Sequence, residues 1–301
     1  MKPDGKLANC IDSKDFIITA EYLPRASTEP SVNEAVVKAL NSKIKAVNVA
    51  DNPNGIVSSS LAGSVKLSCS GIEPVYQIVT RDRNRIALQS DLLGAASLGI
   101  KNVLCLSGYH QTLTDCPQSA NVYDIDSIQL IAAVTQMRDE GVLLDGTKIE
   151  GDFAMLVGAV ANPYLKPLEL NVLRLVKKVE AGASFIQTQA VFDVKGFGEW
   201  MAMARSEGIA ERTAILAGVL ALNNAEEAER LCEKHTDFNI PVEIIARIKK
   251  AGDPEGQRKE GLAIAAEIIK EIRTIEGVRG VHIISGGYET TVPELITASG
   301  L

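Results

Sequence analysis

The strongest constraint on the fold is an alternation, repeated eight times, of a short apolar segment and a longer amphipathic one. The short segments have the length and composition of buried strands, and the longer ones carry apolar residues at helical spacing. We expect strands at Phe16–Tyr22, Ile44–Ala50, Pro74–Thr80, Asn102–Leu106, Phe153–Ala159, Ser184–Ala190, Thr213–Leu220 and Gly280–Ser285. We expect helices at about 31–41, 57–69, 85–98, 125–140, 167–181, 195–206, 224–234 and 255–275.

Strands that alternate with helices pair in parallel through right-handed crossovers. Eight such units close naturally into a (β/α)8 barrel, which needs about 250 residues and places its active site at the C-terminal ends of the strands. We therefore predict one barrel domain over residues 1–301. The competing arrangement is an open doubly wound sheet, which usually carries a G-x-G-x-x-G turn after its first strand. Here the first strand ends in EYLPR, without a glycine, which favours the barrel.

Composition narrows the class of partner. Hydrophobic residues make up 46% of the chain but aromatic residues only 4%, so the core consists mainly of small branched side chains that suit parallel strands. The net charge of −7 argues against nucleic acid and anionic membranes as partners. Residues 1–16 lack the pattern of a signal or transit peptide, and no apolar run approaches the roughly 18 residues of a membrane span. We expect a cytoplasmic protein.

The cysteines and histidines give no sign of a metal centre. None of the five cysteines forms a C-x-x-C pair, and the three histidines form no H-E-x-x-H motif. Zinc and iron–sulfur sites need such clusters of ligands, so we expect no metal site in this chain. We expect its cysteines to be reduced thiols.

Polar residues gather where the predicted strands end. Glu21 follows an apolar stretch of the first strand, and a carboxyl in an apolar barrel mouth has a raised pKa and can act as an acid. A salt bridge at the rim is the alternative. Gln187 and Gln189 share one face of the sixth strand, and buried amides need polar partners. A bound heterocycle or polar neighbours inside the barrel would satisfy them.

The turns after the third and fourth strands add further candidates. Arg81, Arg83 and Arg85 lie within five residues and could bind phosphate, although an arginine–aspartate turn that pairs with itself explains them equally well. After the fourth strand, Gly108 would let a flat ligand approach the backbone. The polar segment 109–121 reads as a long loop, and long loops in compact domains are often functional.

Taken together, these strand ends resemble methylenetetrahydrofolate reductases. The resemblance runs from about Phe16 to the C-terminus. The chain is similar to the short bacterial form, in particular to the flavin subunit of enzymes from acetogens and other anaerobes. It rests on ordered segments: AEYLPR, AVNVADNP, TRDRNR with LQSDLLGA, LCLSGYH and KKVEAGASFIQTQAVFD.

The resemblance implies a flavin at the barrel mouth, whose hydride reduces methylenetetrahydrofolate to methyltetrahydrofolate. Glu21 falls on the family's general acid, which helps to open the folate ring. Gln189 falls on a glutamine that contacts folate, and Gln187 and Tyr109 are the other substrate-binding candidates. The cofactor-binding candidates are Asn48, Ala50, Gln77, Arg81, Ser107, Gly108, Tyr123, Asp124, Asn162, Asn171 and Lys178.

Four positions depart from the family pattern. Tyr109 stands where the family usually has an aspartate near the flavin, and Ala225 stands in place of an aromatic residue that stacks on nicotinamide or folate. Asn162 and Asn171 occupy positions that serve the adenosine half of FAD in other members. The flavin is therefore FMN or FAD. The resemblance implies that the electron donor is either NAD(P)H or a partner subunit with iron–sulfur and zinc sites, and that the protein is an oligomer.

Two other functions remain open at this point. One is a folate-binding methyltransferase barrel that acts with a corrinoid protein, which the tyrosine at position 109 keeps in consideration. The other is a barrel subunit of a larger redox complex that has lost catalysis. Retention of Glu21 and Gln189 argues against this second alternative.

Overall fold

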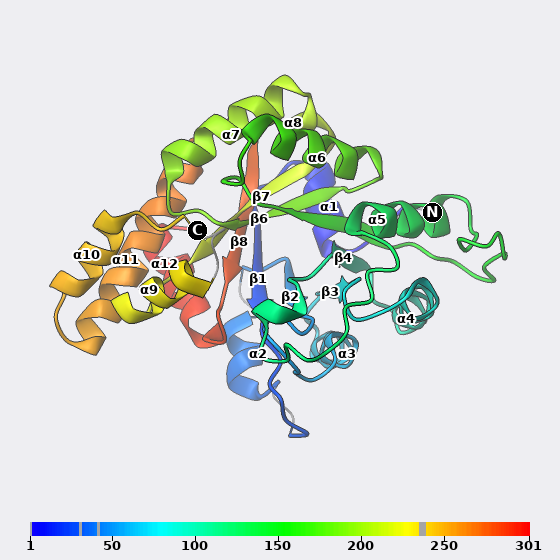
Figure 1. The fold of residues 1–301 in the computed structure, drawn as a ribbon, viewed down its shortest axis with the longest axis horizontal. Coiled ribbons are helices and arrows are strands. Elements are labelled where there is room, and N and C mark those ends of the chain that lie inside the picture. The colour runs from blue at the N-terminus through cyan, green and yellow to red at the C-terminus, as the bar shows by residue number, and fades with distance from the viewer. Residues whose placement is uncertain (1, 30–31, 41–42, 235–238) are drawn as a thin grey trace.

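The computed structural model describes residues 2–29, 32–40, 43–234 and 239–301. Eight parallel strands pair in sequence order and close on themselves, because the first strand also pairs with the last (Figure 1). This closure confirms the predicted (β/α)8 barrel and excludes the open sheet. The strands are β1 (Ile17–Tyr22), β2 (Ala46–Val49), β3 (Pro74–Val79), β4 (Asn102–Leu106), β5 (Leu156–Ala161), β6 (Phe185–Ala190), β7 (Ala214–Leu220) and β8 (Val278–Ile284).

Helices surround the barrel and connect its strands (Figure 1). Those that correspond to predicted helices are α2 (Glu34–Leu40), α3 (Ser60–Cys69), α4 (Arg85–Ser97), α5 (Ser127–Asp139), α6 (Leu168–Glu180), α7 (Val194–Ser206), α9 (Ala225–Lys234) and α11 (Pro254–Ile272). The sequence patterns did not predict α1 (Lys6–Ser13), α8 (Ile209–Arg212), α10 (Val242–Lys250) and α12 (Val292–Ser299). Two 3₁₀ helices, η1 (Gln111–Leu113) and η2 (Glu289–Thr291), lie in loops at the C-terminal ends of β4 and β8.

Several predicted boundaries are displaced by a few residues. We predicted that the fifth strand begins at Phe153, whereas β5 begins at Leu156, whose N–H donates to Lys101 O. Phe153 is buried without being part of the strand, because it packs into the larger apolar core. The eighth strand begins at Val278, two residues earlier than predicted. Ser31, the first residue of the first predicted helix, lies outside the described residues.

The unpredicted helix α1 closes the N-terminal end of the barrel. Its Leu7 and Cys10 pack with inward-facing side chains from the strands, among them Ile17 and Phe185, and all four are buried. A second and larger apolar core lies between the outer face of the sheet and the helices. Because apolar residues fill one end of the barrel, the polar inner residues are concentrated toward the other end, where the strands terminate.

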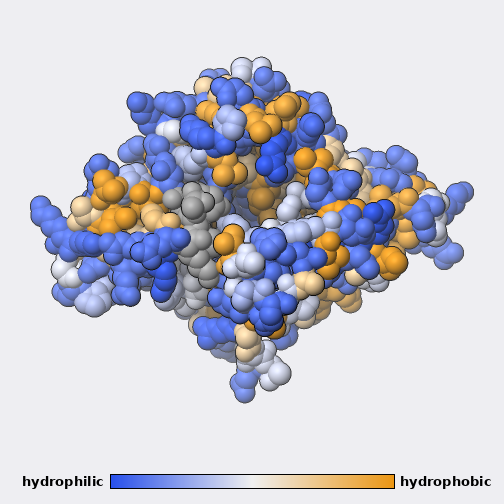
Figure 2. All heavy atoms as spheres, in the orientation of Figure 1, coloured by the Kyte–Doolittle hydropathy of each residue, from blue (hydrophilic) through white to orange (hydrophobic). Residues whose placement is uncertain are grey.

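The outer surface of the protein carries both hydrophilic and apolar residues. Hydrophilic residues dominate the face shown in Figure 2, and the apolar residues on it form separate patches. Within the described residues, no helix combines the length and apolar character that crossing a membrane requires. The same residues contain no cluster of three or more histidine, cysteine, aspartate or glutamate side chains suited to hold a metal ion.

Candidate active site

Glu21 is half-buried at the C-terminal end of β1, where the predicted mouth lies. Its Oε2 accepts a hydrogen bond of 3.2 Å from the N–H of Gly286, in the loop after β8. Gly286 has a φ of 57°, a conformation that glycine adopts without strain. No lysine or arginine among the described residues forms an ion pair with Glu21, so the structure gives no support to a rim salt bridge.

The environment of Glu21 favours its protonated form. Burial raises the pKa of the carboxyl, and the negative charge of Glu289 raises it further, whereas the N–H of Gly286 acts in the opposite direction. Glu289 is itself buried, and its Oε1 accepts a hydrogen bond of 2.9 Å from Leu23 N. Glu289 lies in η2, and in the sequence it is only one acidic residue in the segment after the last strand. Sequence reasoning did not single it out.

Gln189 reaches across the mouth from β6 to the loop after β4. Its Nε2 donates a hydrogen bond of 2.9 Å to the hydroxyl of Tyr109, and both side chains are half-buried. The structure therefore brings together two of the three substrate-binding candidates. Tyr109 is thus a direct partner of Gln189.

Gln187, the third candidate, lies deeper and has protein partners for its amide. It is 2% exposed and exchanges two hydrogen bonds with Asn48, at 2.6 and 3.0 Å. A further bond of 3.2 Å leads to Thr19, which in turn contacts His282 at 3.0 Å. Polar neighbours inside the barrel thus satisfy Gln187 in this structure. Thr19 and His282 were missed because single polar residues in apolar strands give little signal.

The three arginines after β3 are all paired with aspartates. Arg83 binds Asp51 at 2.7 Å, and Arg85 binds Asp124 at 2.8 Å. The side-chain hydrogen bond from Arg85 lowers the pKa of Asp124 to about 2. Arg81, which is 2% exposed, binds Asp82 at 2.8 Å. All three arginines are therefore engaged by aspartates, but only the Arg81–Asp82 pair lies within the turn, since Asp51 follows β2 and Asp124 follows β4.

Arg81 also fixes the loop that carries Tyr109. Its Nη1 donates to Tyr109 O at 3.2 Å, and its Nη2 donates to Asn52 O at 2.8 Å. Gly108 packs over this side chain with a φ of 80°, and a Cβ at that position would lie 3.2 Å from the Cβ of Arg81. Gln111 adds a bond of 3.0 Å to Asp82. The predicted long loop is thus attached to the neighbouring strand ends.

Four of the cofactor candidates lie around the ends of β2, β3 and β4. Ala50 is buried, and the half-buried Gln77 faces inward by alternation with the inner-core residue Val75. The side chain of Gln77 forms no hydrogen bond within the described residues. Ser107 O accepts from Arg81 N at 3.1 Å. The hydroxyl of Tyr123 donates to Gly108 O at 3.2 Å, which places this tyrosine beside the glycine turn.

The remaining candidates lie on the β5 and α6 side. The ammonium of Lys178 donates to Val160 O at 2.6 Å, and burial lowers the pKa of this lysine to about 8. Asn171 donates to Asn162 O at 2.5 Å, so these two asparagines fasten the loop between β5 and α6. Ala225 is buried at the start of α9, where its N–H donates to Gln257 Oε1 at 3.0 Å.

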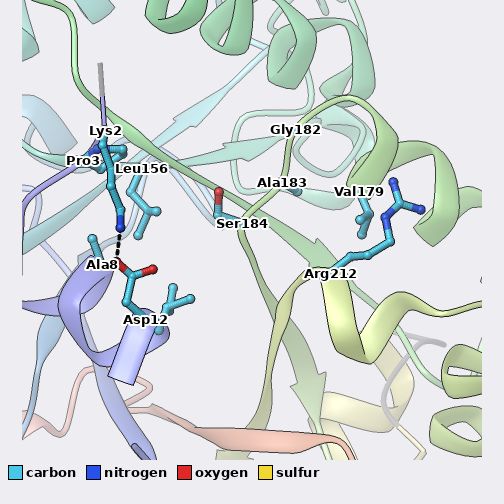
Figure 3. Close-up of a pocket in the computed structure, with 11 residues that line it drawn as sticks. Lys2, Pro3, Ala8, Asp12, Leu156, Val179, Gly182, Ala183, Ser184 and Arg212 are labelled. Atoms are coloured by element: carbon cyan, nitrogen blue, oxygen red, sulfur yellow. Dashed lines mark ion pairs between the residues drawn. The ribbon is translucent and has the colours of Figure 1, made fainter. Parts of the chain in front are cut away.

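A hollow of about 360 Å³ lies at the opposite end of the barrel (Figure 3). Ala8 of α1, Leu156 at the start of β5 and Ser184 just before β6 line it. An ion pair of 2.6 Å joins Lys2 and Asp12 beside it. Because these residues precede their strands, the hollow is separate from the group of polar residues at the mouth.

Comparison with known proteins identifies sequence relatives. Residues 6–300 match the family model described as methylenetetrahydrofolate reductase. A probable methylenetetrahydrofolate reductase (NADPH) of Caenorhabditis elegans is 20% identical over 83% of this chain and 36% of its own length. The 5,10-methylenetetrahydrofolate reductases of Pectobacterium carotovorum and Escherichia coli are 24% and 25% identical, over 71% and 61% of this chain and 65% and 55% of theirs. The chain thus spans less than two thirds of each relative.

A solved structure from Clostridium thermocellum has a similar fold, with a TM-score of 0.68 and 11% sequence identity over 98% of this chain and 99% of that one. It is described as an uncharacterized protein that binds two copies of 5-methyl-5,6,7,8-tetrahydrofolic acid. At this level of identity, the likeness establishes the barrel architecture.

Proposed function

Because the chain belongs to the methylenetetrahydrofolate reductase family, we propose that it reduces methylenetetrahydrofolate to methyltetrahydrofolate with a bound flavin. The observation that carries the proposal is Glu21, a carboxyl held in the barrel mouth with a raised pKa and no basic partner among the described residues. A raised pKa favours the protonated form of the carboxyl, which can deliver its proton to a substrate. The C. thermocellum barrel supports the proposal in that its fold accommodates a reduced folate.

The residues at the ends of β3 and β4 have the chemistry that a flavin ring requires. Gln77 offers an amide donor and acceptor that no described residue uses, and Ala50 carries only a methyl group. Gly108 is exposed and has no side chain to obstruct a planar ring. We propose that these three residues, with Ser107 and Tyr123, hold the ring. When bound, the flavin supplies the hydride for the reduction.

Glu21 supplies the proton in this proposal. Its carboxyl protonates the amine nitrogen that leaves the folate methylene carbon when the five-membered ring opens. Gly286 keeps the carboxyl in place through its N–H. The neighbouring charge of Glu289 favours the protonated form of Glu21 before the substrate binds.

Gln189 and Tyr109 bind the folate from the other side of the mouth. Their mutual hydrogen bond orients the glutamine amide. Arg81 supports this pair because it holds the backbone of Tyr109. The tyrosine is neutral at pH 7, so in this protein the cation formed on ring opening lacks the negative charge that an aspartate would supply there.

The cofactor and the electron donor belong to the same proposal. We propose FMN or FAD as the flavin, with the ammonium of Lys178 near its phosphate, because this group has donors beyond the one used by Val160 O. The internal bond between Asn171 and Asn162 leaves fewer groups for an adenosine and favours FMN. With Ala225 buried, stacking on a nicotinamide is not available there, which favours an electron-donating partner subunit.

Mass spectrometry of the native protein, together with its visible spectrum, tests the proposal. We expect about one flavin per chain, absorbance typical of an oxidised flavin, and the mass of any subunit that remains bound. A colourless protein that binds neither FMN nor FAD on titration would contradict the proposal. Methyl transfer to a corrinoid protein without any reduction would instead identify the methyltransferase alternative.

A further inference from the structure

Four buried polar side chains form one hydrogen-bonded layer inside the barrel, below the residues of the proposed site. We call them the polar layer: Thr19, Asn48, Gln187 and His282. All four are at most 5% exposed, although they face the interior of a barrel whose lower end is apolar. Burying so many polar groups is costly unless every one is bonded, so such a layer indicates a specific role.

The polar layer joins two strands that the sheet does not join. Glu21 follows Thr19 by two residues on β1, and Gln189 follows Gln187 by two residues on β6. β1 pairs only with β2 and β8 within the closed barrel, so no backbone bond sets its separation from β6. The bond of 3.2 Å from Gln187 Nε2 to Thr19 Oγ1 crosses the barrel and links the two strands directly.

The hydrogen bonds also fix where the protons lie. Gln187 Nε2 donates to both Asn48 Oδ1 and Thr19 Oγ1, so both of its protons are used. Thr19 Oγ1 accepts one of these bonds, and we infer that its own proton points to His282 Nδ1 at 3.0 Å, because Val281 O is farther away at 3.5 Å. With Nδ1 as an acceptor, the ring of His282 is neutral and carries its proton on Nε2.

The surroundings of His282 keep it in that state. Burial lowers the pKa of the imidazole to about 3, and no charged side chain contributes to the shift. The residues beneath the polar layer, such as Ile17 and Phe185, are apolar and buried. Because the ring stays neutral, the arrangement of hydrogen bonds in the layer should not change through the ordinary histidine range of pH.

We propose that the polar layer is a positioning device, which sets the distance between Glu21 and Gln189 across the barrel mouth through the Gln187–Thr19 bond. The positioning role rests on the proposed function, whereas the direction of the hydrogen bonds does not. A displacement of catalytic groups by about 1 Å lowers the reaction rate about 10²-fold. Loss of the polar layer should therefore lower turnover more than it weakens substrate binding.

Thr19→Val tests the proposal, because valine has the shape of threonine and lacks both the acceptor and the donor. Thr213→Val is the matched control, since the buried hydroxyl of Thr213 has no hydrogen-bond partner in the described residues. We expect Thr19→Val to lower kcat for methylenetetrahydrofolate by about 10- to 100-fold with a smaller change in KM. Thr213→Val should stay within about threefold of the unaltered protein, and circular dichroism establishes that both variants fold. Equal rates for the two variants would overturn the positioning role.

A ¹⁵N NMR measurement of the unaltered protein tests the hydrogen bonds separately. We expect the His282 signals of a neutral ring with the proton on Nε2, unchanged between about pH 5 and pH 9. A proton on Nδ1, or titration near the ordinary histidine pKa of about 6.5, would overturn the assignment. Absence of any reduction in the unaltered protein would refute the proposed function and with it the positioning role. The NMR result would still decide the direction of the hydrogen bonds.

Discussion

Replacement of Glu289 by glutamine removes a negative charge from behind Glu21 with little change in shape. The glutamine carbonyl can still accept the hydrogen bond from Leu23 N, so the end of β1 should stay in place. The charge of Glu289 is near enough to raise the pKa of Glu21, and we take a separation of about 7 Å, close to the span of two strand residues, to work out the magnitude. At an effective dielectric constant of about 40, between the protein surface and water, like charges at that distance repel by about 1.2 kcal/mol. The expected effect is a fall of about one unit in the pKa of Glu21.

The sign of this effect is visible in the pH profile. Glu21 acts as an acid in the proposed mechanism, so kcat/KM falls as pH rises through its pKa. Loss of the neighbouring charge lowers that pKa, and the alkaline limb of the profile should move to lower pH by about one unit. The groups that contribute to the pKa of Glu21 are Glu289 and the loop residues Ser285 and Gly286, and only the first of these carries a charge.

The assay is kcat/KM for methylenetetrahydrofolate from about pH 5 to pH 9, with reduced protein and an artificial electron donor. Glu276→Gln is the control, because the side chain of Glu276 is 85% exposed and lies in the turn before β8. The control should leave the limb in place. If the alkaline limb of the pH profile stays in place or moves to higher pH in a folded Glu289→Gln protein, the charge of Glu289 does not raise the pKa of Glu21.

Two further substitutions test other parts of the site. Glu21→Gln should lower the rate constant of methylenetetrahydrofolate reduction in a single-turnover assay by about 10²- to 10⁴-fold, because the amide has no acidic proton. A rate constant within threefold of that of the unaltered protein would exclude Glu21 as the acid. Arg81→Met should destabilise the protein by about 3 kcal/mol in urea unfolding, because it leaves the partly buried Asp82 without its main partner. Arg258→Met, at an exposed pair, should cost less than about 1 kcal/mol, and equal losses would contradict the role of Arg81.

The barrel could be predicted from the sequence because its period is repeated along the whole chain. Each strand is a short apolar run and each main helix an amphipathic one, so the order alone implied parallel closure. Helices outside that period, such as α1 and α10, were missed. α1 packs only three of its residues into the barrel end and is otherwise polar, so its pattern resembles an exposed terminus.

The candidate site was predictable to the level of strand ends and no further. Alternation indicated that Gln187 and Gln189 face the same side, but it could not say that one is enclosed while the other reaches Tyr109. The partners of Gln187 lie 139 and 168 residues away along the chain. Sequence spacing carries no information on such contacts, and for the same reason the pairing of Arg85 with Asp124 was not apparent.

The central claim is tested most directly by mixing the protein, with its flavin reduced by dithionite, with methylenetetrahydrofolate in the absence of oxygen and corrinoid. The account predicts that the flavin is reoxidised in a single exponential phase and that one methyltetrahydrofolate forms for each flavin oxidised. Flavin that stays reduced in the presence of excess methylenetetrahydrofolate, with no methyltetrahydrofolate formed, would contradict it.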